Sequence, residues 1–511
     1  MKISRKKSSF FTLVFASFPL FGNAADIDIN DIRAEYLYQT GSFNINAGVL
    51  SPLGAVSQPA NVLSAFLFAK DCLGPSSLSA NATSIVFSEQ FGMPTSPIKA
   101  GAYIVDCKNV GVAFDAGGIE LNMVNSYISD ASYGLYFDNV EFSKFSFAAG
   151  HVKNSSSAKS INGIVLNDCK IGSGEVFEIE SAAATIELNY AGYKSATGLS
   201  YTASAGSHAN TFKINGELTV NIGGTVEKSA TAIGVHTSSK RFEAGFLRVN
   251  FLDDRILDEN RIAVHMSNKG ANEFVTTVPK LVIDGKESPD YAKAYFGSAI
   301  NGSIVSEGDL TISGSIRMGT YDEEFLHNNR IITKDIHGVE GGGRLVFSDV
   351  YFSVENKTGL EAKEVFFSGA NIIFENEKSQ ISFSDTETVT ISEDTKFYIR
   401  ISEDFSFAER EMHMIDFNGA KVNFVSELMD SLTDEAPAGG TSGYDKYIGL
   451  LNAEGKDVTE ELKNKYGIQI DFNLETGSIK FTSNVPEPAE YAAAFGALAL
   501  FGVLVSRKPR K

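Results

Sequence analysis

The chain has 511 residues, 43% of them hydrophobic, and a formal net charge of −19 at pH 7. This length is enough for two or three ordinary domains or for one long repetitive one. A strongly acidic surface repels the phosphate backbone of DNA and RNA, so we expect no nucleic-acid partner. Three cysteines are too few for a scaffold held together by disulfides.

Residues 1–24 have the three parts of a secretory signal peptide. A positively charged start is formed by Lys2, Arg5, Lys6 and Lys7. The apolar run at 10–21 is too short to cross a membrane as a helix, and residues 22–24 (Gly-Asn-Ala) are small enough for cleavage between Ala24 and Ala25. We therefore expect signal peptidase to remove residues 1–24 and the mature chain to be exported.

Residues 25–101 give the weakest signal and receive no fold assignment. The acidic cluster around Asp26 is no calcium loop of the EF-hand type, because Asp31 and Leu37 stand where that loop needs Gly and Glu. Residues 61–70 are predicted as one short helix. A small lectin-like module on an inert stalk is one hypothesis for this region.

From residue 102 to 425 the sequence is a series of short β-strands separated by Gly, Asn, Asp and Ser. Apolar residues alternate with polar ones across 211–227, and Gly216 interrupts the alternation. Residues 310–318 repeat this pattern around Gly314. A period of two indicates half-buried strands, and helical periodicity is nearly absent. The predicted fold class is all-β.

The spacing of these strands indicates which all-β architecture they form. Between 344 and 401 the strand centres fall at nearly even intervals, near Phe347, Phe366, Phe383 and Ile399. Sandwiches built from hairpins turn about every 8–12 residues, whereas these intervals are longer and closer to one coil of a solenoid. We therefore predict a right-handed parallel β-helix (a β-solenoid) over 102–425, with tandem β-sandwiches as the alternative.

Residues 426–484 are predicted to form a small α+β cap. Residues 431–444 read as a surface loop, and a short helix begins with Asp457 at the N-cap and Glu460 at N3 and ends at Gly467. Strands at 468–472 and 478–482 follow around a turn. Such a cap would cover the open end of the solenoid, where an unpaired strand edge invites aggregation.

Residues 485–511 have three parts in a fixed order. Pro486, Glu487 and Pro488 come first, and an uncharged segment follows at 491–505. A basic cluster then comprises Arg507, Lys508, Arg510 and Lys511. As a helix the uncharged segment spans about 22 Å, a short single transmembrane helix for a hydrocarbon core of about 30 Å. The positive-inside rule keeps the cations cytoplasmic and places residues before 485 outside.

This order resembles the PEP-CTERM sorting signal. The resemblance implies that Pro486, Glu487 and Pro488 are the sorting motif and that the basic cluster is the cytoplasmic stop. It also implies processing by an exosortase, a membrane protease-transpeptidase of Gram-negative bacteria that make extracellular polysaccharide. It covers only residues 485–511, and a plain membrane anchor is the alternative. Removal of segments 1–24 and 491–511, which each carry four cations and no acids, lowers the net charge from −19 to −27.

The three cysteines allow two arrangements in an exported chain. One is a disulfide between Cys72 and Cys107 that leaves Cys169 as a thiol, and the other is three reduced thiols. Their spacings match no zinc pattern. Cys169 lies in an apolar run and is predicted to be buried, as free cysteines often are.

Motifs for catalysis are absent from the sequence. It has no HExxH, no GxSxG and no P-loop, and no pair of its seven histidines has the spacing of helical metal ligands. Asp253-Asp254 and His337-Gly338 follow the order found in β-helix pectin hydrolases, but Ile336 replaces a glycine and no Arg-x-Lys follows. Tryptophan, on which sugar subsites commonly stack, is absent. We expect no catalytic residues, no metal and no cofactor.

These features together predict an exported, non-catalytic protein of the cell surface or extracellular matrix. The body resembles autotransporter passengers, which implies adhesion to extracellular polysaccharide or to other cells. Signal peptidase and exosortase are the processing partners, and the C-terminal helix holds the chain in the inner membrane before processing. A secreted β-helix polysaccharide lyase or hydrolase is the alternative function.

Overall fold

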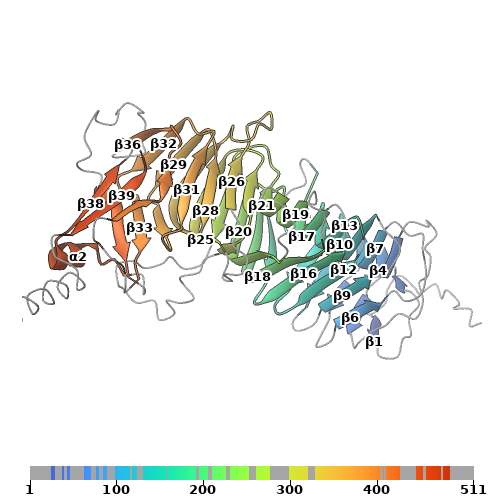
Figure 1. The fold of residues 1–511 in the computed structure, drawn as a ribbon. Helices are drawn as coiled ribbons and strands as arrows, with labels where there is room; N and C mark the ends of the chain where they lie inside the picture. The colour runs from blue at the N-terminus through green and yellow to red at the C-terminus, as the bar shows by residue number, and fades with distance from the viewer. Residues whose placement is uncertain are drawn as a thin grey trace, which may run out of the picture.

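The computed structural model describes the strands and their close connections, namely residues 25–28, 37–39, 43–46, 63–70, 76–79, 84–88, 98–114, 118–123, 130–156, 158–191, 195–204, 210–225, 231–252, 260–276, 298–319, 329–402, 405, 407, 410–425, 445–452, 456–473 and 476–483. These residues form a right-handed parallel β-solenoid with one short helix. Figure 1 shows its strands stacked side by side along the length of the molecule. The predicted all-β solenoid is confirmed.

One wall of the solenoid is a sheet of 13 described strands, all paired in parallel. Its order is β2 (Leu37–Gln39), β4 (Leu63–Lys70), β7 (Ile98–Val105), β10 (Ala131–Asp138), β13 (Ser160–Asn167), β17 (Ser195–Thr202), β19 (Thr231–Thr237), β21 (Arg261–Met266), β24 (Ser303–Ser306), β26 (Asn329–Thr333), β28 (Lys357–Glu361), β31 (Gln380–Ser384) and β35 (Ile415–Asp416). Each coil therefore adds one strand to this wall.

The remaining walls form one bent sheet of 21 described strands. In chain order these are β5 (Ser76–Ser79), β6 (Ser84–Ser88), β8 (Lys108–Ala113), β9 (Gly118–Met123), β11 (Glu141–Ser146), β12 (His151–Ser156), β14 (Lys170–Ile171), β15 (Val176–Glu180), β16 (Ala184–Ala191), β18 (Thr211–Thr225), β20 (Arg241–Phe251), β22 (Asn272–Thr276), β23 (Ser298–Ile300), β25 (Leu310–Met318), β27 (Arg344–Val354), β29 (Glu364–Ser368), β30 (Asn371–Phe374), β32 (Thr388–Ser392), β33 (Lys396–Arg400), β36 (Lys421–Val425) and β37 (Ile448–Leu451). A further pair, β1 (Ala25–Asp28) and β3 (Phe43–Asn46), is also parallel.

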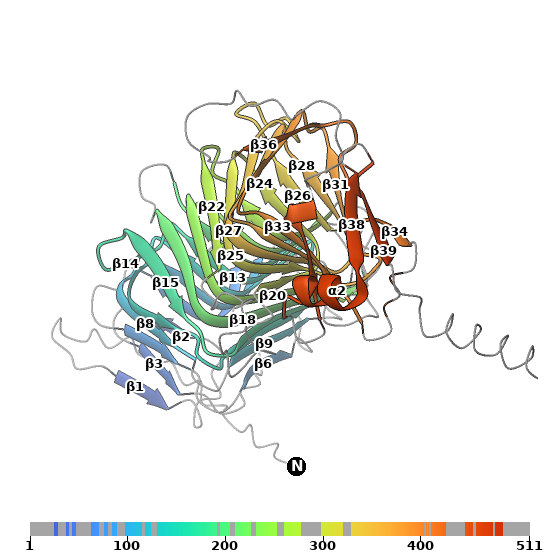
Figure 2. The ribbon, with the colours of Figure 1, turned by 90° about the vertical axis from the view of Figure 1, so that its left-hand side faces the viewer.

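Glycine makes the bend in the longest strands. In β18 the pairing register shifts between Ile214 and Glu217, and Gly216 between them has φ of +111°. A Cβ on Gly216 would lie 1.6 Å from the carbonyl oxygen of Ser181, so no other residue fits there. Gly314 has the same role in β25, with φ of +93°. Figure 2 shows β18, β20 and β25 curving around the solenoid. The predicted interruptions at both glycines are confirmed.

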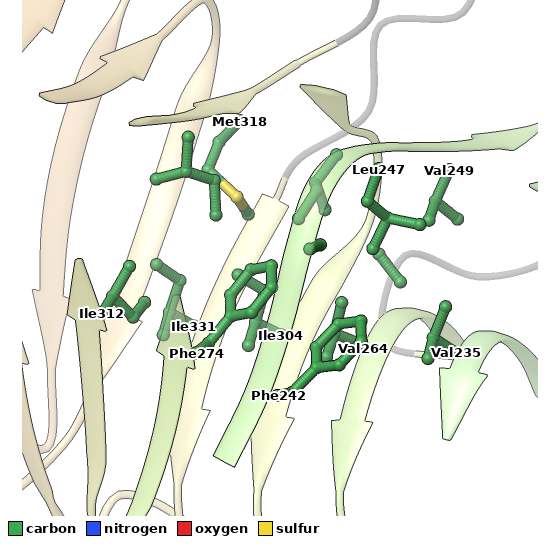
Figure 3. Packing of buried hydrophobic residues seen from close by; sticks show 14 of the residues in the cluster. Val235, Phe242, Leu247, Val249, Val264, Phe274, Ile304, Ile312, Met318 and Ile331 are labelled. Carbon is green, nitrogen blue, oxygen red and sulfur yellow. The ribbon is translucent and has the colours of Figure 1, made fainter. Parts of the chain in front are cut away.

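Equivalent side chains of successive coils stack inside the solenoid. The rings of Phe212 and Phe242 lie 5.5 Å apart, and those of Phe242 and Phe274 lie 5.2 Å apart and nearly parallel. Aliphatic side chains of the 13-stranded sheet, such as Val235 and Val264, pack with them in the same core (Figure 3). All these residues are fully buried. Burial of one such side chain contributes about 1.5–3 kcal/mol, so the stack is a main source of stability.

A column of glycines allows the walls to approach each other. Successive strands of the 13-stranded sheet carry it, and its members are Gly101, Gly134, Gly163, Gly198 and Gly234. A Cβ on Gly163 would lie 2.4 Å from the carbonyl oxygen of Gly198 and 2.4 Å from Cγ2 of Ile186 on the opposite wall. Each of the other positions has a similar pair of close neighbours. The column is therefore a packing requirement repeated once in each coil.

We expect Gly163→Ala to lower the free energy of unfolding by about 1–3 kcal/mol, because the new methyl group overpacks the junction of two walls. Thermal and denaturant unfolding of the purified variant measure this change. Gly359→Ala in β28 is the matched control, since its Cβ would have no neighbour closer than 3.6 Å. Equal stability of the two variants would contradict the packing role of the column.

The predicted even spacing between 344 and 401 is wrong as a measure of one coil. Phe347 pairs with Phe367 of the next coil, whereas Phe177 pairs with Phe212, so the coils differ widely in length. Phe383 belongs to β31 in the other sheet. The predicted centres had combined strands of different walls, which gave a regular but misleading spacing.

The N-terminal region differs from expectation in two ways. Residues 63–70, predicted as part of a helix, form β4, whose apolar and β-prone run pairs in parallel with β7. The helix prediction is wrong because pairing with a neighbouring coil outweighs weak local propensity. Strands β2, β4 and β5 to β7 belong to the same two large sheets. The solenoid therefore continues on the N-terminal side of the boundary expected at residue 102.

A small α+β unit closes the C-terminal end, as predicted, but its limits differ from the predicted 426–484. Strand β37 still pairs in parallel with β33 of the solenoid, and a strand before residue 426 joins the sheet of the unit. The single-turn segment η4 (Asp445–Tyr447) leads into β37, and α2 (Thr459–Tyr466) then precedes β38 (Ile468–Asn473) and β39 (Ser478–Ser483). These two strands form an antiparallel sheet with β34 (Arg410–His413). Figure 2 shows α2 and this sheet at the end of the stack. Phe472 is buried against Phe397 of the last coils, so the unit covers the core.

The limits of α2 agree with the prediction at one end only. Gly467 has a left-handed conformation and donates its N–H to the carbonyl oxygen of Lys463, which confirms the predicted C-terminal stop. Val458, not Asp457, occupies the N-cap. Asp457 Oδ1 instead accepts hydrogen bonds from the backbone N–H and hydroxyl of Thr459, at 2.9 and 2.6 Å. Its carboxylate therefore still satisfies a donor at the start of the helix.

The signal peptide 1–24, the sorting motif at 486–488, the helix 491–505 and the basic stop all lie outside the described residues. Within the described ranges, no helix combines the length and the hydropathy needed to cross a membrane.

Candidate functional site

The outer corner between the two large sheets carries polar residues in an unusual backbone conformation. On three successive coils this corner is occupied by Asp106, Asn139 and Asp168, with φ of +54°, +53° and +50°. Asp and Asn tolerate this left-handed conformation better than other residues with a side chain. The corner turns the chain out of one wall and into the next, so the three side chains recur at equivalent places. We call these three residues the corner ladder.

Hydrogen bonds between coils fix the side chains of the ladder and its neighbours. Asn139 Nδ2 donates to Asp106 Oδ1 at 2.7 Å, and the Ser204 hydroxyl donates to Asp168 Oδ2 at 2.8 Å. One residue earlier on each coil, Asn167 Nδ2 donates to Asp138 Oδ1 at 2.9 Å. The polar groups are therefore held in place before any ligand arrives.

An open cavity of about 660 Å³ lies along the corner ladder. Its acceptors are the carboxylates of Asp106, Glu141 and Asp168, and its donors are Lys108, Asn139, Lys170 and Ser204. Lys170 Nζ lies 3.2 Å from Glu141 Oε2, so one lysine is already paired within the cavity. We call this space the corner cavity. It offers acceptors and donors side by side on a rigid wall.

Partly exposed tyrosines lie near Asp138 on the 13-stranded sheet. The rings of Tyr103 and Tyr136 stack at 4.3 Å, and Tyr133 meets Tyr136 edge-on at 4.9 Å. Burial raises the pKa of Tyr136, and a hydrogen bond between the Tyr136 and Tyr103 side chains contributes to this shift. Asp138 lies further along the same strand. Burial is also the main reason that the pKa of Asp138 is raised, and Asp168 and Asp106 raise it further.

The chemistry of this site is that of hydrogen bonding. Carboxylates accept, lysine and amide nitrogens donate, and hydroxyls do both. In the described ranges, no group of three or more His, Cys, Asp or Glu side chains has the arrangement to hold a metal ion. The corner cavity therefore presents hydrogen-bond donors and acceptors next to each other.

A second polar cluster lies on the same outer face, several coils further on. The rings of His236 and His265 stack at 5.0 Å. His265 Nε2 lies 3.1 Å from Glu307 Oε1, which also binds Lys334 Nζ at 3.0 Å. Ser200 Oγ lies 3.3 Å from His236 Nδ1. Burial lowers the pKa of His236 to about 4, and the neighbouring His265 contributes to this shift.

The geometry of this cluster differs from that of a catalytic triad. In a triad the carboxylate orients the same histidine that faces the serine. Here Glu307 contacts His265, whereas Ser200 contacts His236. Burial alone would raise the pKa of Glu307, but hydrogen bonds from His265 and Lys334 outweigh it and the net pKa is lowered. The cluster therefore links polar side chains of neighbouring coils without the contacts of a triad.

His236 makes stability depend on pH. Its pKa is about 4 in the folded chain against 6.5 for the free side chain, so between these values the unfolded chain binds a proton that the folded chain does not. The contribution of neutral His236 to the free energy of unfolding is therefore fully present above pH 6.5. It decreases on acidification towards pH 4, by about 2–3 kcal/mol at pH 4.5.

We expect His236→Gln to reduce this pH dependence of stability when melting temperatures are compared at pH 7 and 4.5. The control His337→Gln, in an exposed loop, should keep it, and a wild-type slope in His236→Gln would contradict the assignment.

The structure places the predicted site residues as follows. Asp253 and Asp254 lie outside the described residues, as does Cys72, so the disulfide with Cys107 stays a prediction. His337 lies in an exposed turn, where its backbone N–H donates to Asp335 Oδ1 at 2.8 Å. Cys169 is fully buried, as predicted, and burial raises the pKa of its thiol.

Both polar clusters were missed at the level of sequence, although a signal existed. A glycine followed at a constant interval by Asp or Asn recurs on consecutive coils, as Gly101/Asp106, Gly134/Asn139 and Gly163/Asp168. The first residue of each pair belongs to the glycine column and the second to the corner ladder. His236 and His265 occupy paired positions of β19 and β21. Alignment of the chain with itself, with gaps that allow for coils of unequal length, would have found both sets.

Comparison of this chain with protein-family models, with curated proteins and with solved structures finds no match.

Proposed function

We propose that this protein is an exported, non-catalytic protein of the cell surface or extracellular matrix that holds extracellular polysaccharide. The observation that carries this proposal is the corner ladder with its cavity, which presents fixed hydrogen-bonding groups on three successive coils. Coils stack at about 4.8 Å, so the wall offers a regular row of polar groups. A repetitive polymer rich in hydroxyl groups is the natural counterpart of such a row.

Two features of the sequence support export and sorting. Residues 1–24 have the form of a signal peptide, and residues 485–511 resemble the PEP-CTERM signal. Exosortase would then act near Pro486, Glu487 and Pro488, after the helix at 491–505 has held the chain in the inner membrane. The resemblance implies a Gram-negative host that makes extracellular polysaccharide, and this is the reason we propose association with the surface matrix.

The rigidity of the scaffold suits adhesion. The backbone beneath the outer face is held by pairing within two large sheets and by a buried aromatic stack, so little backbone entropy is lost on binding. The acidic exterior keeps the protein soluble and keeps copies of it apart.

The sorting part of the proposal is tested by intact mass of the protein recovered from its native host. We expect the wild type to lack residues 1–24 and the apolar tail. The triple variant Pro486→Ala, Glu487→Ala, Pro488→Ala should keep its tail, because the motif that exosortase reads is gone. Pro509→Ala, which also removes a proline from the C-terminal segment but leaves the motif intact, is the control. A wild type that retains its residues to Lys511 in the inner membrane would contradict the proposal and leave a plain anchor.

A further inference from the structure

The corner cavity has a charge that discriminates between classes of polysaccharide. Three carboxylates, from Asp106, Glu141 and Asp168, face two lysines, and Asp138 lies beside them. Four acidic side chains, with Asp138 included, therefore outnumber the two lysines, and the site has a net negative charge. The whole chain is also acidic, with a net charge of −19. A uronic-acid polymer would bring further carboxylates to this surface, and like charges in contact are unfavourable. A neutral glycan brings none.

The hydrogen-bonding capacity of the cavity matches neutral hydroxyl groups. A hydroxyl both donates and accepts, so it can bridge a carboxylate and a neighbouring lysine or amide. Hydrogen bonds to ionised groups are about twice as strong as those between neutral groups. Asp106 and Asp168 lie two coils apart on the same corner, with Asn139 between them. A chain of sugars along the solenoid axis would meet these groups in succession.

We propose that the corner cavity is the binding site for a neutral polysaccharide, with Asp106 and Asp168 as its principal acceptors and the lysines as donors. This inference rests on the proposed function and specifies its ligand and its site. The stacked Tyr103–Tyr136 pair does not line the cavity, but it lies on the two strands that lead into this corner and near Asp138.

Affinity electrophoresis of the full-length protein tests this proposal. The gels contain dextran, mannan or galactan as neutral probes and alginate or polygalacturonate as acidic ones. We expect retardation by at least one neutral polymer and none by the acidic polymers. The double variant Asp106→Asn/Asp168→Asn keeps side-chain size and tolerance of the left-handed conformation but removes both charges. Its affinity should fall at least tenfold.

The matched control is Asp349→Asn/Asp385→Asn. Both aspartates also have positive φ, of +48° and +57°, but neither lines the cavity. This control should bind like the wild type. Lys108→Gln/Lys170→Gln changes two exposed side chains of the cavity, so it tests the site without altering the corner backbone and should weaken binding several-fold.

The possible results distinguish failure of the corner cavity as the binding site from failure of polysaccharide binding as the function. Equal binding by the wild type and both cavity variants would overturn the site and leave polysaccharide binding intact. Retardation by acidic polymers alone would overturn the assignment of a neutral ligand. If no polymer of either class retards the wild type, the proposed polysaccharide-binding function itself fails.

Discussion

Parallel, in-register pairing of each coil with the next is the interaction on which the rest of this structure depends. Because strands pair residue for residue, a side chain needed at one place in one coil is needed at the same place in the next. The phenylalanine stack and the glycine column both follow from this repetition. Parallel strands cannot be joined by tight hairpins, so every coil must travel around the molecule before it pairs.

The same pairing also organises the outer surface. The corner ladder is the polar counterpart of the glycine column, since each glycine lets the walls approach and the Asp or Asn that follows it turns the corner. Core packing and surface chemistry thus both follow from one repeat. A protein of this kind can place equivalent polar groups at equal intervals along a rigid wall without a dedicated binding domain, which suits contact with a polymer better than with a small molecule.

Local patterns in the sequence were sufficient for some features and insufficient for others. Alternation around Gly216 and Gly314 and the stop at Gly467 are set by neighbouring residues, and all three were predicted correctly. The corner cavity and the His236–His265 contact join residues from different coils, which are of unequal length. No local window contains both partners, and unequal coils hide a fixed period. The strand at 63–70 was mistaken for a helix for the same reason, since β7, with which it pairs, lies a whole coil further along the chain.

Distances between spin labels along one outer column test the in-register stack most directly. Val176, Glu273 and Val346 occupy one column through successive pairings, with Glu273 three strands and Val346 five strands from Val176. Genetically encoded labels at Val176 and Glu273 should give a backbone separation of roughly 14 Å, and labels at Val176 and Val346 roughly 24 Å, at about 4.8 Å per strand. An increase of about 10 Å between the two pairs would support the stack. Equal distances, or the reverse order, would contradict it and with it the regular polar wall.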